Sequence, residues 1–210
     1  EEHARLGAVK GVITYADGDT LNLFTEFGVA QHAEINFDLA NKTDGDLRKA
    51  CVDVIRLQRK YLGGIGFSHV HAFCGDEFFD NLLKNPEVRA TYEGWSDAKI
   101  LRESYIGKSR GENPMFEFGG IVFENYGEID DEGVGVESAK CHLFPSGVPN
   151  LFRTYYAPAD YIETVNTRGK RLYSKQMRMR NDKGVDGEMQ SNALQLCTRP
   201  KVLMKAKMAA

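Results

Sequence analysis

Apolar residues between Leu47 and Leu62 recur at the spacing of one helical face, while mostly charged residues occupy the opposite face. This pattern predicts an amphipathic helix. Thr43 is a candidate N-cap, and Gly63-Gly64 supplies the left-handed conformation in which helices commonly end. We therefore expect a long helix that packs one face on a core.

Strand and helix patterns alternate after this helix. The continuous run from Phe67 to Cys74 predicts a buried strand, and apolar residues from Phe78 to Leu83 follow at helical spacing. Asn85-Pro86 then suits the start of a second short helix, because proline is favoured at the first helical position.

Strand patterns dominate the two ends of the chain. Val9 to Ala16 and Thr20 to Phe27 flank Asp17-Gly18, a dipeptide typical of hairpin turns, so a hairpin is expected after a short helical lead. Helices mixed with strands in the middle, together with strand-rich ends, indicate an α+β protein. Further strands are predicted at Met115 to Phe118, Ile121 to Tyr126, Cys141 to Phe144 and Leu151 to Tyr156, with a turn-rich segment from Pro145 to Pro149.

Composition limits the class of protein. The chain has 210 residues, of which 42% are hydrophobic, enough for one sizeable core or two small ones. No apolar run approaches the about 20 residues that a membrane-spanning helix needs, so a soluble protein without a membrane partner is expected. Cys51, Cys74, Cys141 and Cys197 are widely spaced among apolar neighbours, which predicts reduced core cysteines of an intracellular protein.

Charge is unevenly distributed along the chain. Residues 168–210 contain 11 Lys+Arg and 3 Asp+Glu, a net charge of +8, which leaves 16 and 27, a net charge of −11, for residues 1–167. A basic C-terminal region suits an acidic partner or nucleic acid. Arg178-Met179-Arg180 alternates as in a strand, however, and a solvated strand face is the favoured explanation.

His69 and His71 are the most prominent candidates for chemistry. Alternate residues of a strand share a face, which places the two imidazoles roughly 7 Å apart and near enough to share a metal ion. Cys74 should point to the other face, and no third ligand is evident. A metal-dependent hydrolase that uses His69 and His71 is therefore kept only as an alternative hypothesis.

Other catalytic patterns are incomplete. Gly107-Lys108-Ser109 resembles the end of a phosphate-binding loop but has Arg102 where the motif needs glycine, and Ser146 lacks the flanking glycines of a nucleophile elbow. Asp130-Asp131-Glu132 could attract a cation but lacks the spaced acidic ladder of a calcium loop. We expect no catalytic residues and no cofactor, and a protein whose role is contact.

Several stretches, taken in order, resemble the major capsid protein E family of lambda-like tailed phages and prophages. No single stretch is a catalytic signature, and the specificity comes from the ordered set, which extends over nearly the whole chain. The stretches are Gly11-Val12-Ile13, Leu23 to Val29, Phe116 to Ile121, Leu143 to Gly147, Tyr156 to Asp160, Glu163 to Asn166, Asp186 to Ser191 and Leu196 to Pro200.

The resemblance implies the Hong Kong 97 phage capsid fold, with a mixed-sheet axial domain that carries helices and a β-rich peripheral domain. Residues 1–35 and 162–210 would form the peripheral domain, and residues 36–161 the axial domain. Family members carry an N-terminal arm, an extended loop and most of a spine helix before the position of Glu1, so the resemblance also implies an N-terminally truncated chain.

The implied function is that of a virion structural protein, which self-assembles through pentamers and hexamers into an icosahedral shell around DNA. Head-decoration and scaffold proteins would be further partners, DNA would be bound only non-specifically, and the bacterial host cytoplasm would hold the protein before assembly. A separate hypothesis, a nucleic-acid-binding module, would use Arg178, Arg180, Lys201, Lys205 and Lys207. The candidate subunit-interface residues are Asp130, Asp131, Pro145, Ser146, Gly147, Arg178 and Arg180.

Overall fold

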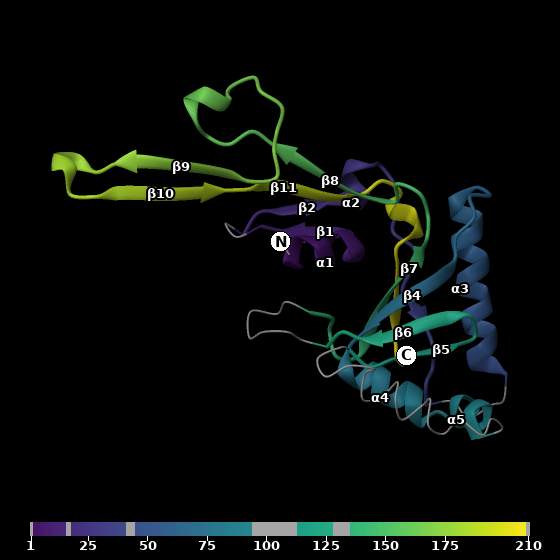
Figure 1. Cartoon of the computed structure of the whole chain (residues 1–210). Coiled ribbons are helices and arrows are strands. Elements are labelled where there is room, and N and C mark those ends of the chain that lie inside the picture. Colours follow the sequence, from purple (N-terminus) through teal and green to yellow (C-terminus); the bar gives the residue numbers. More distant parts are fainter. Residues whose placement is uncertain (1, 16–17, 41–44, 94–112, 128–134, 209–210) are drawn as a thin grey trace.

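In the computed structural model, which describes residues 2–15, 18–40, 45–93, 113–127 and 135–208, the body of the molecule is built on a six-stranded sheet (Figure 1). Its strands are β3 (Ile35–Asn36), β4 (His69–Cys74), β5 (Met115–Phe118), β6 (Ile121–Asn125), β7 (Lys140–Ser146) and β12 (Met204–Lys207). The strand order is β3-β12-β7-β4-β6-β5. The sheet is mixed, because β4 and β6 are parallel, as are β12 and β3, whereas the other neighbours are antiparallel.

Helices cover one face of this sheet. They are α3 (Asp46–Leu62), α4 (Asp76–Lys84) and α5 (Pro86–Glu93), close to the bounds that the apolar spacing predicts. Strand β4 alternates between buried and half-buried residues, so Val70, Ala72 and Cys74 face the helices. Gly63 ends α3 with a φ of 64°, as predicted. The buried face of α3 consists of Leu47, Cys51, Val54, Gln58 and Leu62.

A second hydrophobic cluster lies outside the sheet. It joins α1 (Glu2–Lys10), β1 (Val12–Thr14), β2 (Thr20–Asn22) and α2 (Leu23–Glu26) to the short helix η3 (Pro200–Val202). Its buried members are Ala8, Ile13, Leu23, Phe24, Leu62, Leu151, Cys197, Val202 and Leu203.

The end of α3 connects the two clusters. Tyr61 and Phe67 pack against both of them. Gln58 Nε2 donates a hydrogen bond of 3.3 Å to the carbonyl oxygen of Val202, and Arg199 Nη1 donates one of 3.4 Å to the carbonyl oxygen of Leu62. The two cores are therefore continuous through the C-terminal turns of α3.

The predicted N-terminal hairpin is shorter than the sequence suggests. Only Val12–Thr14 and Thr20–Asn22 pair, because the first run begins inside α1 and the second turns into α2. Asn22 causes the second change, since its Oδ1 accepts hydrogen bonds from the backbone N–H groups of Phe24 (3.0 Å) and Thr25 (3.4 Å). An asparagine side chain in this position starts a helix. The expected helical lead is confirmed by α1.

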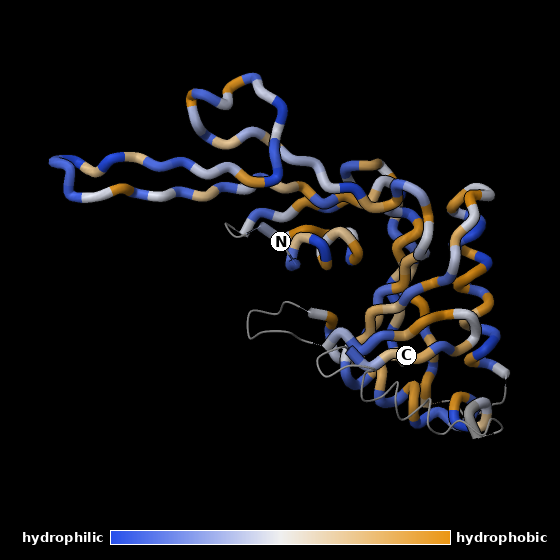
Figure 2. The backbone as a smooth tube through the Cα atoms, viewed as in Figure 1, coloured by the Kyte–Doolittle hydropathy of each residue, from blue (hydrophilic) through white to orange (hydrophobic). Residues whose placement is uncertain are grey.

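Two antiparallel pairs form an arm that leaves the body (Figure 1). Strand β8 (Phe152–Ala157) pairs with β11 (Asn192–Cys197), and β9 (Tyr173–Arg178) pairs with β10 (Val185–Gln190) beyond them. The short helices η1 (Ile162–Thr164) and η2 (Arg180–Asp182) belong to the same region. Figure 2 shows hydrophobic residues concentrated in the body, while the β9–β10 hairpin is largely hydrophilic with isolated hydrophobic positions.

The structure confirms an α+β protein with a mixed sheet. Pairing crosses the division expected at residues 161 and 162, because β8 pairs with β11 in the arm and β12 inserts between β3 and β7 in the body. Thr43 lies outside the described residues. Among the helices that are described, none is long and apolar enough to cross a membrane.

Leu62→Ala should destabilise the protein by about 2–5 kcal/mol, the usual effect of truncating a fully buried leucine. Leu62 has 0% exposure and belongs to the cluster that joins α3 to η3. Chemical denaturation measures the change. Leu172→Ala is the matched control, because Leu172 is 58% exposed and should have an effect within about 0.5 kcal/mol. Equal effects of the two substitutions would contradict this assignment of the core.

Candidate subunit-interface surfaces

The β9–β10 hairpin has two faces that follow from its register. Pairing runs from Tyr173 opposite Gln190 to Arg178 opposite Val185. Because side chains directly opposite each other share a side of the sheet, the register separates them into two sets. The covered face carries Tyr173, Lys175, Met177, Asp186, Glu188 and Gln190, and the open face carries Ser174, Gln176, Arg178, Val185, Gly187 and Met189.

Residues of the preceding loop hold the base of the covered face. Lys175 Nζ lies 3.0 Å from Glu163 Oε1 and 5.0 Å from the centre of the Tyr161 ring. Gln190 Oε1 accepts a hydrogen bond of 3.1 Å from the backbone N–H of Asp160. Through these contacts the loop that contains η1 lies against one side of the hairpin.

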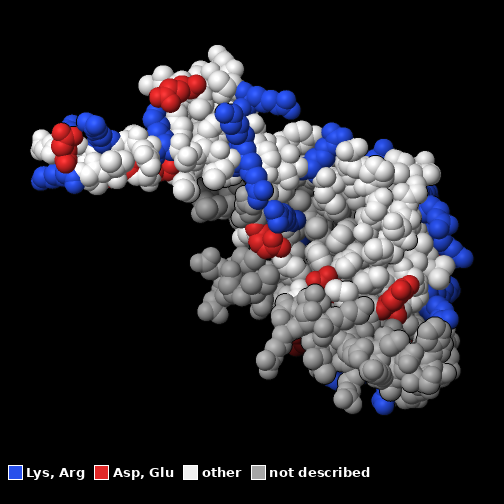
Figure 3. All heavy atoms as spheres, in the orientation of Figure 1, with Lys and Arg blue, Asp and Glu red and all other residues white. Residues whose placement is uncertain are grey.

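The tip of the hairpin is strongly exposed and basic (Figure 3). Arg178 ends β9, and Arg180 begins the turn that continues through Asn181 and Asp182, both with positive φ. Arg178 lies 3.7 Å from Asp182, but both side chains are 84% exposed. An ion pair this exposed adds little stability, so the charge at the tip remains accessible to a partner.

The three consecutive residues predicted to form a subunit interface, Pro145, Ser146 and Gly147, differ in burial. Pro145 is a buried residue of β7 opposite Val70, not the first residue of a turn, so the predicted start of that turn is wrong. The carbonyl of Ser146 points toward β4, where it accepts from Ser68 N at 2.8 Å. The nitrogen of Pro145 must therefore point to the β12 side. Because β12 begins at Met204, opposite Leu143, it does not extend to Pro145 and no ladder hydrogen bond is lost there.

Gly147 begins the exposed turn after β7 and has a φ of 80°. A Cβ at this position would lie 2.2 Å from Ser68 Oγ, so the turn requires glycine in both conformation and space. Ser146 is half-buried, which leaves Gly147 as the most exposed of the three predicted residues. Asp130 and Asp131 lie outside the described residues.

His69 and His71 share one face of β4, as the alternation predicts, with ring centres 6.1 Å apart. Cys74 faces the opposite side and is buried. His71 Nε2 lies 2.7 Å from Glu124 Oε2 on β6, and both side chains are less than a fifth exposed. Burial opposes ionisation of Glu124, but hydrogen bonds from His71 and Asn113 outweigh this and lower its pKa.

The His71–Glu124 pair therefore joins two strands of the sheet. The ring of Phe73 lies 5.2 Å from that of His71, and the ring of Phe144 lies 5.4 Å from it, so aromatic packing surrounds the imidazole. Within the described part of the chain, no three His, Cys, Asp or Glu residues are grouped so that they could hold a metal ion. The hydrolase hypothesis receives no support from this arrangement.

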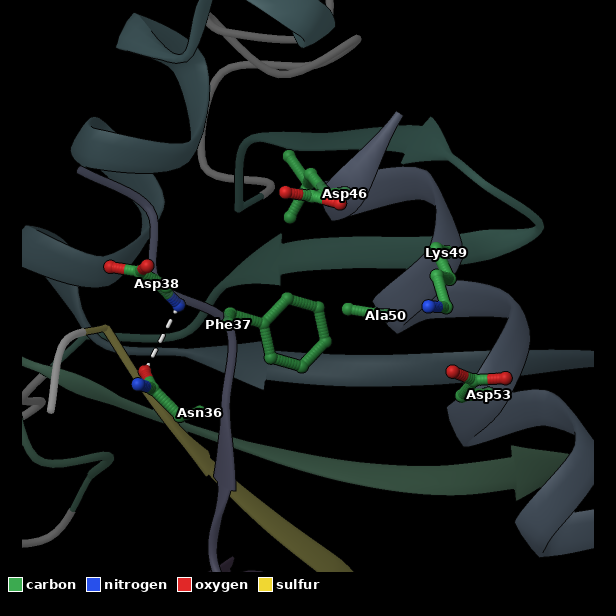
Figure 4. Close-up of a pocket in the computed structure, with 8 residues that line it drawn as sticks. Asn36, Phe37, Asp38, Asp46, Lys49, Ala50 and Asp53 are labelled. Atoms are coloured by element: carbon green, nitrogen blue, oxygen red, sulfur yellow. Dashed lines mark hydrogen bonds between the residues drawn. The ribbon is translucent and has the colours of Figure 1, made fainter. Parts of the chain in front are cut away.

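An acidic hollow of about 240 Å³ lies beside the first turns of α3 (Figure 4). Asp38, Asp46 and Asp53 come from different positions around it, and Lys49 lies between two of them along the helix. The backbone N–H of Asp38 donates to Asn36 Oδ1 at 3.0 Å. The carboxylates line the hollow without converging on one point, so it provides negative charge rather than a binding centre.

His142 is a buried histidine of β7, opposite Lys205 and Phe73 on the neighbouring strands. Burial lowers its pKa from 6.5 to about 3, and the charges of Lys10, Lys205 and Lys140 act in the same direction. His142 is therefore neutral in the folded protein at neutral pH.

The basic residues proposed for nucleic-acid binding are not gathered on one surface. Lys201 Nζ lies 5.0 Å from the centre of the Tyr61 ring, beside the end of α3. Lys205 lies in β12, where burial and the nearby Lys140 lower its pKa. Arg178 and Arg180 stand at the hairpin tip instead. The five residues therefore do not form one continuous basic patch.

Comparison with known proteins identifies the family. A family model described as phage major capsid protein E matches residues 1–208. The chain belongs to the phage major capsid protein E family.

Curated relatives in this family include the major capsid proteins of Pseudomonas phage KPP10 and Salmonella phage Felix O1. The first is 29% identical over 198 residues, which cover 89% of this chain and 55% of the relative. The second is 27% identical over 229 residues, which cover 95% of this chain and 61% of the relative. The chain thus spans little more than half the length of these capsid proteins.

A solved structure described as a prophage capsid protein from E. coli CFT073 has a similar fold. Its TM-score is 0.57 at 13% sequence identity, and the match covers 99% of this chain and 62% of that chain. The likeness therefore extends over both the body and the arm of this member of the capsid protein E family.

Stability should fall below pH 6.5 because of His142. The unfolded histidine binds a proton near pH 6.5, whereas the folded one resists protonation down to about pH 3. The contribution of neutral His142 to the free energy of unfolding is therefore fully present above pH 6.5. It is lost as the pH falls below this value, by up to about 1.4 kcal/mol per pH unit.

His142→Gln keeps a polar side chain and removes this titration. The unfolding free energies of wild type and variant are measured by denaturation at several pH values. The value for wild type minus that for the variant should decrease as the pH falls from about 6 to about 4. At pH 7.5 the histidine is neutral in both the folded and the unfolded state, so the difference measured there reports only the effect of the substitution on packing. A difference that stays constant with pH would contradict the assignment.

Proposed function

We propose that this chain is part of a major head subunit of a tailed phage or prophage, which self-assembles into the icosahedral shell that encloses DNA. The observation that carries the proposal is the match to the capsid protein E family over residues 1–208. Two relatives named as major capsid proteins support it. On this proposal the protein is not an enzyme and uses no cofactor.

The Hong Kong 97 fold is the architecture proposed for the subunit. The body, with its mixed sheet, would correspond to the axial domain, and the hairpin arm with the N-terminal elements to the peripheral domain. The similarity to the prophage capsid protein supports this. The strand pairing suggests one adjustment to the proposed boundaries, because β8 belongs with the arm and β12 with the body.

Subunit contacts are the functional surfaces on this proposal. A shell repeats heterologous contacts around rings of five and six subunits, so each subunit must present complementary flanks. Arg178 and Arg180 at the hairpin tip and Gly147 at the end of β7 are exposed in positions suited to such contacts. Asp130 and Asp131 remain proposed interface residues on sequence grounds.

Further partners follow from the proposed assembly. Head-decoration and scaffold proteins would bind the shell or its precursor, and packaged DNA would be contacted without sequence preference. The protein would be made in the bacterial host cytoplasm and would end in the virion.

The protein in its full natural length, expressed alone or with its scaffold, should form closed shells visible by negative-stain electron microscopy. The shells should contain rings of five and six subunits. Particles that never exceed a small oligomer under any assembly condition would contradict the proposed function. Sequence-selective binding to short duplex DNA at physiological salt, without particles, would favour the nucleic-acid-binding hypothesis instead, because phosphate contacts alone weaken steeply with salt.

A further inference from the structure

We infer that the open face of the β9–β10 hairpin binds a second copy of this chain, which approaches closely across Gly187 between Val185 and Met189. The inference rests on the proposed function, because it names the partner and the contact surface of the arm. Three features carry it: a glycine of the open face without an internal role, exposed apolar residues beside it, and the net charge of the hairpin with its preceding loop, which is opposite to that of the rest of the chain.

Gly187 is the first of these features. It lies within β10 opposite Gln176, and a Cβ added there would meet no atom of the described residues within 4 Å. Its φ is not in the left-handed region. Neither space nor conformation within the chain therefore requires glycine, although glycine in a strand costs about 0.5–1 kcal/mol relative to alanine. A strand glycine without an internal role is typical of a place where another backbone approaches closely.

The apolar residues beside Gly187 are the second feature. Met189 is 77% exposed and Val185 is 60% exposed, and both lie on the open face. Together with Gly187 they form a strip on β10, with Ser174 and Gln176 opposite on β9. Contact surfaces between proteins combine such apolar residues with a polar surround.

The hairpin also needs outside support. A two-stranded ribbon alone is marginally stable in water. The contacts made by Glu163 and Asp160 lie on the covered face near the base of the hairpin. The open face receives no comparable cover from the described part of the chain, and a partner there would stabilise the ribbon over its length.

Charge favours a second copy as that partner. Residues 168–190 contain seven Lys or Arg and three Asp or Glu residues, a net charge of +4, whereas the other 187 residues contain 20 Lys or Arg and 27 Asp or Glu residues, a net charge of −7. The remainder of another subunit is therefore electrostatically complementary to residues 168–190. DNA would also attract the arginines, but phosphate contacts make no use of Val185, Met189 or the flat surface at Gly187.

Cysteine labelling tests this contact directly. The four native cysteines are buried, and burial raises the pKa of Cys51 to about 12 and that of Cys197 to about 11, so they should react slowly. Met189→Cys places a thiol on the open face, and Met177→Cys places one on the covered face of the same hairpin. Maleimide should modify both in the unassembled full-length protein and only the cysteine at position 177 in assembled shells.

A second experiment removes the close approach without weakening the subunit. Gly187→Val should leave the unfolding free energy unchanged or slightly higher, because valine favours strands and meets no neighbour there. It should weaken assembly, measured by the protein concentration at which shells appear, by about tenfold, as expected for an obstructed central contact. Met177→Val on the covered face is the matched control and should assemble like wild type.

The outcomes separate the contact from the proposed function. Wild-type protein that forms no shells would overturn the capsid function itself. Shells in which both introduced cysteines react equally, or which Gly187→Val forms as readily as wild type, would overturn only the contact. Protection of the cysteine at position 189 in DNA-filled particles but not in empty shells would assign the open face to DNA and would also overturn the inference.

Discussion

The attachment of residues 199–202 to the last turns of α3 determines the relation between body and arm. The chain leaves the arm at the end of β11, passes through η3 and enters the central sheet as β12. Between these strands, Val202 accepts a hydrogen bond from Gln58 and Arg199 donates one to Leu62. Because Gln58, Leu62 and Val202 are fully buried, this junction is part of the hydrophobic core and not a contact at the protein surface.

A second crossing lies beside the first. After β7 the chain turns at Gly147 and enters β8. Thr198, which follows β11, forms hydrogen bonds with the end of this turn. The backbone N–H of Thr198 donates to Leu151 O at 2.8 Å, and its hydroxyl donates to Asn150 O at 2.9 Å. Both segments that link the arm to the body are thus hydrogen-bonded to each other. The arm is therefore attached to the body at two adjacent crossings.

Periodicity predicted the elements whose stability is local. The amphipathic spacing of α3 and the alternation of β4 each reflect one buried face, and the structure confirms both. The hairpin near the N-terminus was predicted too long because the capping side chain of Asn22 competes with a strand propensity of similar strength. The place of β12 could not be predicted, since its parallel partner β3 lies about 170 residues earlier and only tertiary packing selects it.

The candidate interface surfaces also include features that the sequence predicts and features that only the structure reveals. The strand alternation predicted for Arg178-Met179-Arg180 holds only at Arg178, because β9 ends there and Arg180, although exposed, lies in η2. Proline commonly marks turns, which predicts a turn at Pro145; yet β12 begins only at Met204, opposite Leu143, so the nitrogen of Pro145 has no ladder bond to make and proline is tolerated in this strand. Gly187 was visible in the sequence, but its interpretation depends on the finding that no atom of the described residues lies within 4 Å of an added Cβ, which only the structure supplies.

The size of the β9–β10 hairpin limits how strongly the inferred contact across Gly187 could hold two subunits together. Strands of six residues extend about 20 Å, and two of them span about 10 Å, so one open face offers a few hundred Å² at most. A stable interface buries about 800 Å² per partner. One arm contact alone is therefore too small to hold two subunits together. If the proposed function holds, many weak contacts of this kind, repeated around a ring, would give a stable shell whose misplaced subunits could still dissociate during assembly.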